Sequence, residues 1–124
     1  MQKWLLLMAG GVCGTAGRYA LAGAVYNWLG ASFPYGTLAV NGLGCFIIGL
    51  LSALDSGRFF LDDNMKMLLA VGFCGAFTTF STFILETAHL AKGEGVWHAL
   101  ANVALSLCLG VLFFVAGRRL GRLF

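Results

Sequence analysis

Four hydroxyl side chains lie within five residues of one another in an otherwise apolar part of the chain: Thr78, Thr79, Ser81 and Thr82. Gly72 and Gly75 come just before them, and glycine and β-branched residues both weaken a helix. We therefore predict a break in the helix near residues 75–79. Backbone groups released inside a membrane must be buried in protein, line water or bind an ion, so the break predicts an ion site. The alternative is an intact helix whose hydroxyl groups bond back to the preceding turn.

Two phenylalanines accompany these hydroxyl groups. Phe80 and Phe83 are three residues apart and so share one face of a helix, while Thr79 and Thr82 share a neighbouring face. The edge of an aromatic ring is positive and a hydroxyl group donates hydrogen bonds, so the combination suits an anion better than a cation. Packing against lipid or against the protein core is the alternative for both rings.

An asparagine lies in another apolar segment, residues 36–44. Asn41 must find hydrogen-bond partners there, because an unsatisfied amide in hydrocarbon is costly. Thr37 comes four residues earlier and shares its helical face. Asn41 is therefore a candidate donor for the same anion, or else a hydrogen-bonded tie between helices.

Two charged side chains also lie inside apolar segments. Arg18 follows a long apolar stretch near the start of the chain. An arginine inside such a segment generally faces an aqueous cavity or a partner and attracts anions, although its long side chain can also reach the headgroups. Glu86 has His89 three residues later, so it could pair with this histidine or lie in a watery mouth.

These residues must be positioned by helices that cross a membrane. Of the 124 residues, 60% are hydrophobic and only 10% are charged, against about 25% charged residues in ordinary soluble domains. Since a helix needs about 20 apolar residues to cross a bilayer, we predict an all-α membrane protein of four transmembrane helices, forming a single domain over residues 1–124. The predicted spans run from about Trp4 to Trp28, Phe33 to Leu54, Met65 to Leu90 and Val96 to Gly117.

Positive charges are distributed unequally between the two ends of these spans. On the side of the termini lie Lys3, Arg58, Lys66, Arg118, Arg119 and Arg122, whereas Lys92 lies on the other side. The positive-inside rule then places both termini in the cytoplasm. Small residues four apart, Gly10 with Gly14 and Gly72 with Ala76, predict that the helices pack closely within the chain or between two copies.

Three motifs that occur in order closely resemble the CrcB/Fluc fluoride channel family. They are Gly14-x-x-Gly17-Arg18-Tyr19, Gly36-Thr37-Leu38-x-Val40-Asn41-x-x-Gly44 and Gly72-Phe73-Cys74-Gly75-x-x-Thr78-Thr79-Phe80-Ser81-Thr82-Phe83. The resemblance covers essentially the whole chain. It implies a fluoride-selective channel that exports fluoride passively across the inner membrane of a bacterium, built as an antiparallel, dual-topology dimer with two pores.

The resemblance also implies roles for individual side chains. Phe80 and Phe83 would line the pores, Asn41 would be the pore asparagine, and Arg18 would lie in a vestibule. The other polar residues of the pore would be Thr37, Ser81, Thr82 and Ser106. These groups would donate the hydrogen bonds that replace the water around fluoride, and a narrow track of them would exclude larger halides.

A structural sodium ion at the centre of the dimer is a further implication of the resemblance. Its ligands would be the backbone carbonyls of Gly75 and Thr78 from each subunit. A buried cation would offset the cost of an anion in the middle of the membrane. The family often has glycine at the position of Ala76, a departure that leaves carbonyl ligands unaffected.

Two alternatives stay open at this point. The unequal charge distribution suits one fixed orientation, so the dimer could instead be a heterodimer of two chains. The alternative function is a small proton-coupled multidrug transporter, which also has four spans and pairs antiparallel, but it needs a carboxylate in the first span, and none occurs there. Because no nucleotide-binding motif or catalytic pair occurs, we expect neither an enzyme nor a nucleic-acid partner.

Overall fold

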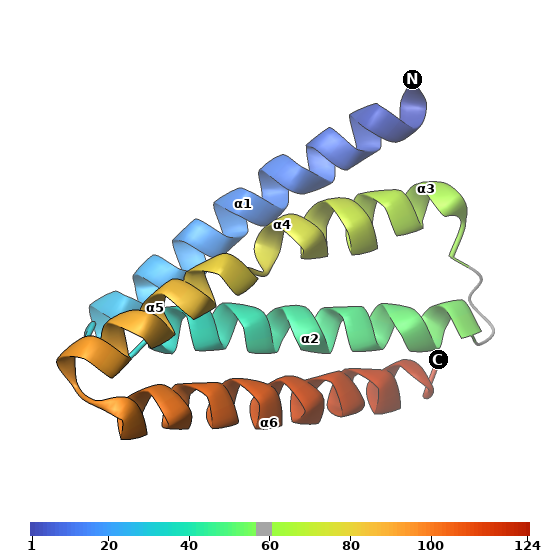
Figure 1. Ribbon diagram of the computed structural model, residues 1–124. Helices are drawn as coiled ribbons and strands as arrows, with labels where there is room; N and C mark the ends of the chain where they lie inside the picture. Colours follow the sequence, from blue (N-terminus) through green and yellow to red (C-terminus); the bar gives the residue numbers. More distant parts are fainter. Residues whose placement is uncertain (57–60) are drawn as a thin grey trace.

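The computed structural model describes residues 1–56 and 61–124, and the regular structure in these ranges is helical (Figure 1). The elements are α1 (Gln2–Leu29), α2 (Tyr35–Ser56), α3 (Asp63–Met65), the π-helical η1 (Lys66–Cys74), α4 (Gly75–Phe77), α5 (Phe80–Gly93) and α6 (Val96–Gly121). Four segments are long and apolar enough to cross a membrane: α1, α2, residues 63–93 and α6. The four predicted spans are therefore confirmed to within a few residues. Arg58, which contributed to the predicted orientation, lies outside the described residues.

The outer helices expose apolar side chains along their whole length. Examples are Met8 and Val12 on α1, and Leu107 and Val111 on α6. A surface helix of a soluble protein would show a polar face instead. These faces must therefore be covered by lipid or by another apolar protein surface.

The helices are arranged in two closely packed pairs, with both termini at the same end of the molecule (Figure 1). α1 packs on η1 and α4, whereas α2 packs on α6. A Cβ atom at Gly10 would collide with the carbonyl oxygen of Leu68, and Gly14 meets the third span in the same way. Gly49 and Gly117 make equally close contacts between α2 and α6. The close packing predicted at Gly10 and Gly14 is thus confirmed, and it occurs within one chain.

Two short reversals join the helices at the end opposite the termini. Gly30, at the end of α1, has φ 83°, and Gly95, at the start of α6, has φ 96°. Residues other than glycine rarely adopt these values, so glycine is required at both turns. The reversals bring the ends of α1, α2 and α5 close together.

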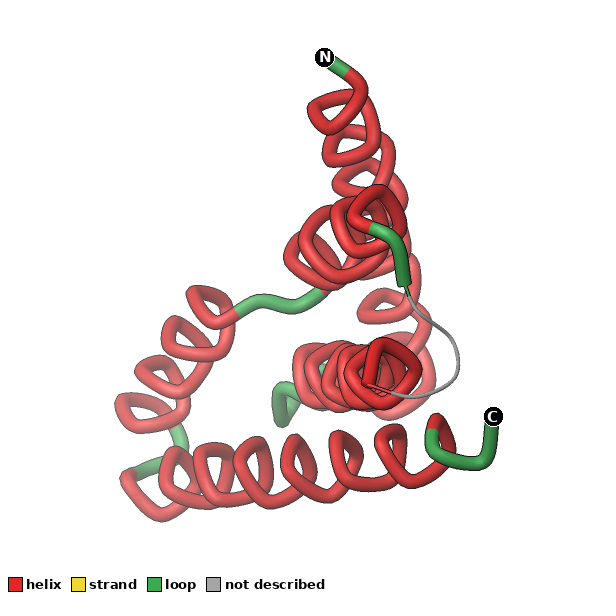
Figure 2. The backbone as a smooth tube through the Cα atoms, turned by 90° about the vertical axis from the view of Figure 1, so that its right-hand side faces the viewer, coloured by secondary structure: helices red, strands yellow, loops and turns green. Residues whose placement is uncertain are grey.

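The third span changes conformation at Thr78 and Thr79. Their φ and ψ angles are −82° and 158°, and −147° and 120°, so both residues are extended. Gly75 was expected to provide the backbone freedom, but it is helical with φ −63° and ψ −35°. At the extended pair the chain steps away from α1: η1 and α4 pack on α1, whereas α5 packs on α6 (Figures 1 and 2).

Candidate functional site

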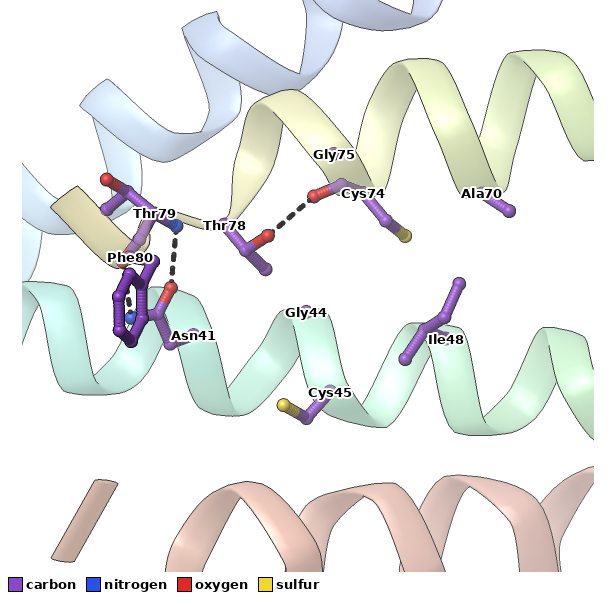
Figure 3. Close-up of a pocket in the computed structure, with 10 residues that line it drawn as sticks. All are labelled: Asn41, Gly44, Cys45, Ile48, Ala70, Cys74, Gly75, Thr78, Thr79 and Phe80. Carbon is purple, nitrogen blue, oxygen red and sulfur yellow. Dashed lines mark hydrogen bonds between the residues drawn. The ribbon is translucent and has the colours of Figure 1, made fainter. Parts of the chain in front are cut away.

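The side chain of Asn41 on α2 holds the extended backbone of the third span (Figure 3). Its Nδ2 donates to the carbonyl oxygen of Thr79 at 3.0 Å, and its Oδ1 accepts from the N–H of Thr79 at 2.8 Å. The amide thereby satisfies both backbone groups of a residue that has left the helix, as a neighbouring strand would. This pair uses one of the two amide N–H groups of Asn41.

Thr79 also caps the helix that follows. Its Oγ1 accepts from the N–H of Thr82 at 3.3 Å and donates to the hydroxyl of Thr82 at 2.9 Å. The hydroxyl of Ser81 lies 3.5 Å from the same oxygen. Three hydroxyl groups therefore gather at the N-terminus of α5, which is the positive end of its dipole.

These hydrogen bonds release two carbonyl groups from the helical ladder. In a continuous helix, Gly75 O would accept from the N–H of Thr79, and Thr78 O from the N–H of Thr82. The first N–H instead donates to Asn41, and the second to the hydroxyl of Thr79. Gly75 and Thr78 both line a cavity of about 430 Å³ between α2 and the third span (Figure 3).

The two phenylalanines lie next to each other but differ in exposure. The ring centroids of Phe80 and Phe83 are 5.8 Å apart, with the ring planes tilted by 43°. Phe83 is buried at 9% exposure, whereas Phe80 is 74% exposed and lines the same cavity as Asn41. The expectation that the two residues share a helix face is therefore confirmed, and the ring of Phe80 is free to meet lipid or another chain.

Glu86 is bound by residues of two other helices. Its Oε1 accepts hydrogen bonds from the hydroxyl of Tyr26 on α1 at 2.8 Å and from that of Thr37 on α2 at 2.9 Å. Pairing with His89 was one of the two expectations for this residue. In the part of the chain that the structure describes, Glu86 pairs with these two hydroxyls and not with His89, because its carboxyl group turns towards α1 and α2. Glu86 and His89 both line a cavity at the end of the helices.

Arg18 lines a smaller cavity of about 220 Å³ between α1, α2 and α5. Two of the predicted pore residues, Thr37 and Thr82, line it as well, together with Thr79 and Glu86. The structure thus brings Arg18 together with Thr37 and Thr82, whereas Asn41 lines the other cavity with Phe80. Ser81 and Ser106 are not in the described lining of this cavity; Ser81 is exposed and Ser106 is half-buried on α6.

One buried amide was missed by the sequence analysis. Asn102 on α6 is 1% exposed, and its Nδ2 donates to the hydroxyl of Thr87 at 2.8 Å. Thr87 in turn donates to the carbonyl oxygen of Phe83 at 2.7 Å. The signal was available, because an asparagine inside the most apolar span needs partners for the same reason as Asn41. This hydrogen bond connects α6 to α5 one helical turn after Phe83.

Four apolar helices long enough to cross a bilayer, with polar side chains around extended backbone between them, define a multi-pass membrane protein. The chain belongs to the CrcB-like family (Camphor Resistance, CrcB), whose family model matches residues 5–118.

Three relatives carry the name fluoride-specific ion channel FluC. The protein of Magnetococcus marinus is 50% identical over 121 residues, which are 97% of this chain and 96% of the relative. That of Dehalococcoides mccartyi is 42% identical over 123 residues, covering 99% of this chain and 95% of the relative. That of Aeromonas salmonicida is 42% identical over 120 residues, covering 97% and 96%.

Proposed function

We propose that this protein is a fluoride-selective ion channel through which fluoride leaves the cell passively. The observation that carries the proposal is the collection of hydrogen-bond donors around the extended Thr79: an amide N–H of Asn41 and the hydroxyls of Ser81 and Thr82. The names of the relatives agree with it.

The chemistry of these groups suits a small, strongly hydrated anion. Fluoride gives up its water only where other donors replace it, and here the donors are neutral and closely spaced. The positive edges of Phe80 and Phe83 add to them, and Thr37 and Ser106 would extend the polar track. The guanidinium of Arg18 would raise the local concentration of anions at the entrance.

The pores would be completed by a second, oppositely oriented copy of the chain. Phe80 is 74% exposed beside exposed Ser81, and the cavity that contains Asn41 is open on one side of the single chain. A polar, aromatic surface at membrane depth is poorly suited to lipid. An antiparallel dimer would cover it and form two pores along the interface.

A structural sodium ion would fit between the two copies. Among the described residues, no group of three or more His, Cys, Asp or Glu side chains could hold a metal ion, so a cation here would need backbone ligands. The carbonyls of Gly75 and Thr78 are hard oxygen donors released from the helical ladder, as such a cation prefers. When bound, the ion would supply positive charge that lowers the cost of an anion nearby.

Fluoride flux tests the proposed function. Purified protein in liposomes loaded with potassium fluoride should release fluoride after addition of a potassium ionophore, and liposomes loaded with potassium chloride should release chloride at least about a thousandfold more slowly because the larger ion does not fit the same narrow track. Equal halide rates would contradict the channel. Flux that requires a proton gradient would support a proton-coupled transporter instead.

The substitution Gly75→Val tests the proposed dimer and the cation site at its centre. A Cβ atom at Gly75 meets nothing within 4 Å in the single chain, so the chain itself should tolerate valine. In the proposed dimer the side chain would separate the two copies at the centre. We expect folded monomer without flux by size exclusion and liposome assay, whereas full flux with an intact dimer would contradict the central site.

A further inference from the structure

Two cavities share a pair of lining residues, one on α1 and one on α5. The outer cavity, of about 370 Å³, lies at the end with the short reversals, and its lining includes Ser32, His89 and Glu94. The inner cavity, of about 220 Å³, is the one lined by Arg18. Tyr26 and Glu86 are the residues common to the described linings of both cavities. The hydrogen bond between them therefore lies at the boundary of the two spaces.

We propose that Tyr26 is a positioning residue that holds the carboxyl group of Glu86 across this boundary and closes the passage between the two cavities. The 2.8 Å bond from the tyrosine hydroxyl to Oε1 connects α1 to α5. Thr37 donates to the same oxygen at 2.9 Å and connects α2. Three helices thus fix one carboxylate oxygen from two directions.

The ring of Tyr26 is held in place by a matching glycine. A Cβ atom at Gly36 would lie 2.5 Å from the Cε2 atom of the ring and 2.9 Å from the carbonyl oxygen of Ala22. Only glycine at this position leaves room for the ring beside the start of α2. From there the tyrosine hydroxyl reaches Glu86.

The passage joins two spaces of different charge. Glu86 lines both cavities; the outer one also carries Glu94 and His89, whereas the inner one contains the guanidinium of Arg18 beside hydroxyl groups. An anion that moves between them must separate Tyr26 from Glu86. This consequence for fluoride rests on the proposed function, whereas the closure itself does not.

Chemical accessibility of the inner cavity tests the closure. Ala22 lies one helical turn before Tyr26 and lines only the inner of the two cavities, so Ala22→Cys is the probe. Ser32→Cys reports on the outer cavity. Each variant in liposomes is treated on both sides with a small charged methanethiosulfonate reagent, and peptide mapping by mass spectrometry locates the adduct, so the native cysteines stay in place.

With Tyr26 present, the cysteine at position 22 should react at least about tenfold more slowly than that at position 32, since a closure held by a hydrogen bond of ordinary strength reduces access by about this factor. Adding Tyr26→Ala should raise the rate at position 22 about tenfold or more and leave position 32 unchanged. Tyr26→Phe should raise it less, because the ring stays in place while the hydroxyl is lost.

The matched control is Tyr35→Ala, which removes an aromatic residue that lies in neither described lining. It should leave both rates unchanged. Equal rates at positions 22 and 32 with Tyr26 present, or no change on Tyr26→Ala, would overturn the proposal. Fluoride flux is measured on the same liposomes. If the accessibility pattern is as expected but no fluoride flux occurs, the proposed function is contradicted and the closure is not.

Discussion

The two halves of the third span are held in the protein by different forces. The first half, η1 and α4, lies against α1 with backbone touching backbone at Gly10 and Gly14. The second half, α5, is connected to its neighbours by side-chain hydrogen bonds, such as those of Glu86 to α1 and α2 and of Thr87 to α6. Shape complementarity fixes one half, and donors and acceptors fix the other.

This difference separates the fold from the function. Close packing of small residues tolerates no added volume but is indifferent to polarity. A hydrogen-bonded cluster tolerates changes of volume better than the loss of a donor. We therefore expect substitutions at the close contacts between the first half and α1 to act mainly on stability, and those at the hydrogen bonds of the second half mainly on flux.

The largest effect is expected for Gly10→Val. The new side chain would collide with the carbonyl oxygen of Leu68 and the backbone of Phe73, neither of which can turn away. Overpacking against rigid backbone should cost about 3 kcal/mol or more. Thermal unfolding in detergent and the yield of monodisperse protein measure this loss.

The control is the neighbouring glycine on the same helix. A Cβ atom at Gly11 meets nothing within 4 Å, so Gly11→Val should remain within about 1 kcal/mol of the parent, the difference in helix propensity being small. If both valine variants are equally unstable, the close backbone contact at Gly10 is not what stabilises the packing of α1 on the first half of the third span.

Asn41→Asp should reduce fluoride flux about a thousandfold, since a like charge about 4 Å from the anion costs about 4 kcal/mol at an intermediate dielectric constant. The carboxylate still accepts from the N–H of Thr79 but can no longer donate to its carbonyl oxygen. Liposome efflux is the measurement. The control Asn27→Asp, at an exposed position near the end of α1, should conduct normally. If the Asn41 variant fails to fold, Asn41 acts mainly on stability, and this prediction is wrong.

Replacing either phenylalanine by isoleucine should lower flux about tenfold, because the positive ring edge is worth about as much as one weak hydrogen bond. Their effects on stability should differ. Phe83 is 9% exposed and Phe80 is 74% exposed, so Phe83→Ile should cost about 1 kcal/mol and Phe80→Ile close to nothing in the single chain. Normal flux in both variants would show that the rings only pack.

Thr78→Ser should have the smallest effect. Serine keeps the hydroxyl that donates to the carbonyl oxygen of Cys74 at 2.9 Å and loses only the methyl group that contacts Gly44. Loss of one methyl contact costs about 1 kcal/mol, and flux should stay within about twofold, because the proposed ligand at this residue is a backbone atom. A strong loss of flux would assign a direct role to the side chain.

The sequence was sufficient for the spans and for most of the polar centre. Hydropathy and length define the four helices, and an amide, an arginine and a run of hydroxyls in apolar surroundings are conspicuous in any sequence. The weak helix formers at Thr78 and Thr79 mark the position of the extended backbone. The expectation that Gly75 provides the backbone freedom was wrong. Gly75 remains helical, and the helix ends only at the two threonines that follow.

The partners of polar side chains on other helices could not be read from the sequence. The pairing of Glu86 with Tyr26 and Thr37 depends on how three helices are rotated about their axes. In helices that are apolar on all sides, hydropathy gives no information on that rotation. The spacing of Glu86 and His89 suggested a local pair, but hydroxyl groups on two other helices donate to Glu86 instead.

The reversal between α5 and α6 has a consequence for biosynthesis. Only Glu94 and Gly95 separate the two helices, and the positive φ angle of Gly95 turns the chain back at once. Two residues cannot cross a bilayer, so neither helix can take up its position while the other remains in water. We expect the two segments to enter the membrane together as a hairpin, in which the second half of the chain acquires its orientation in a single step.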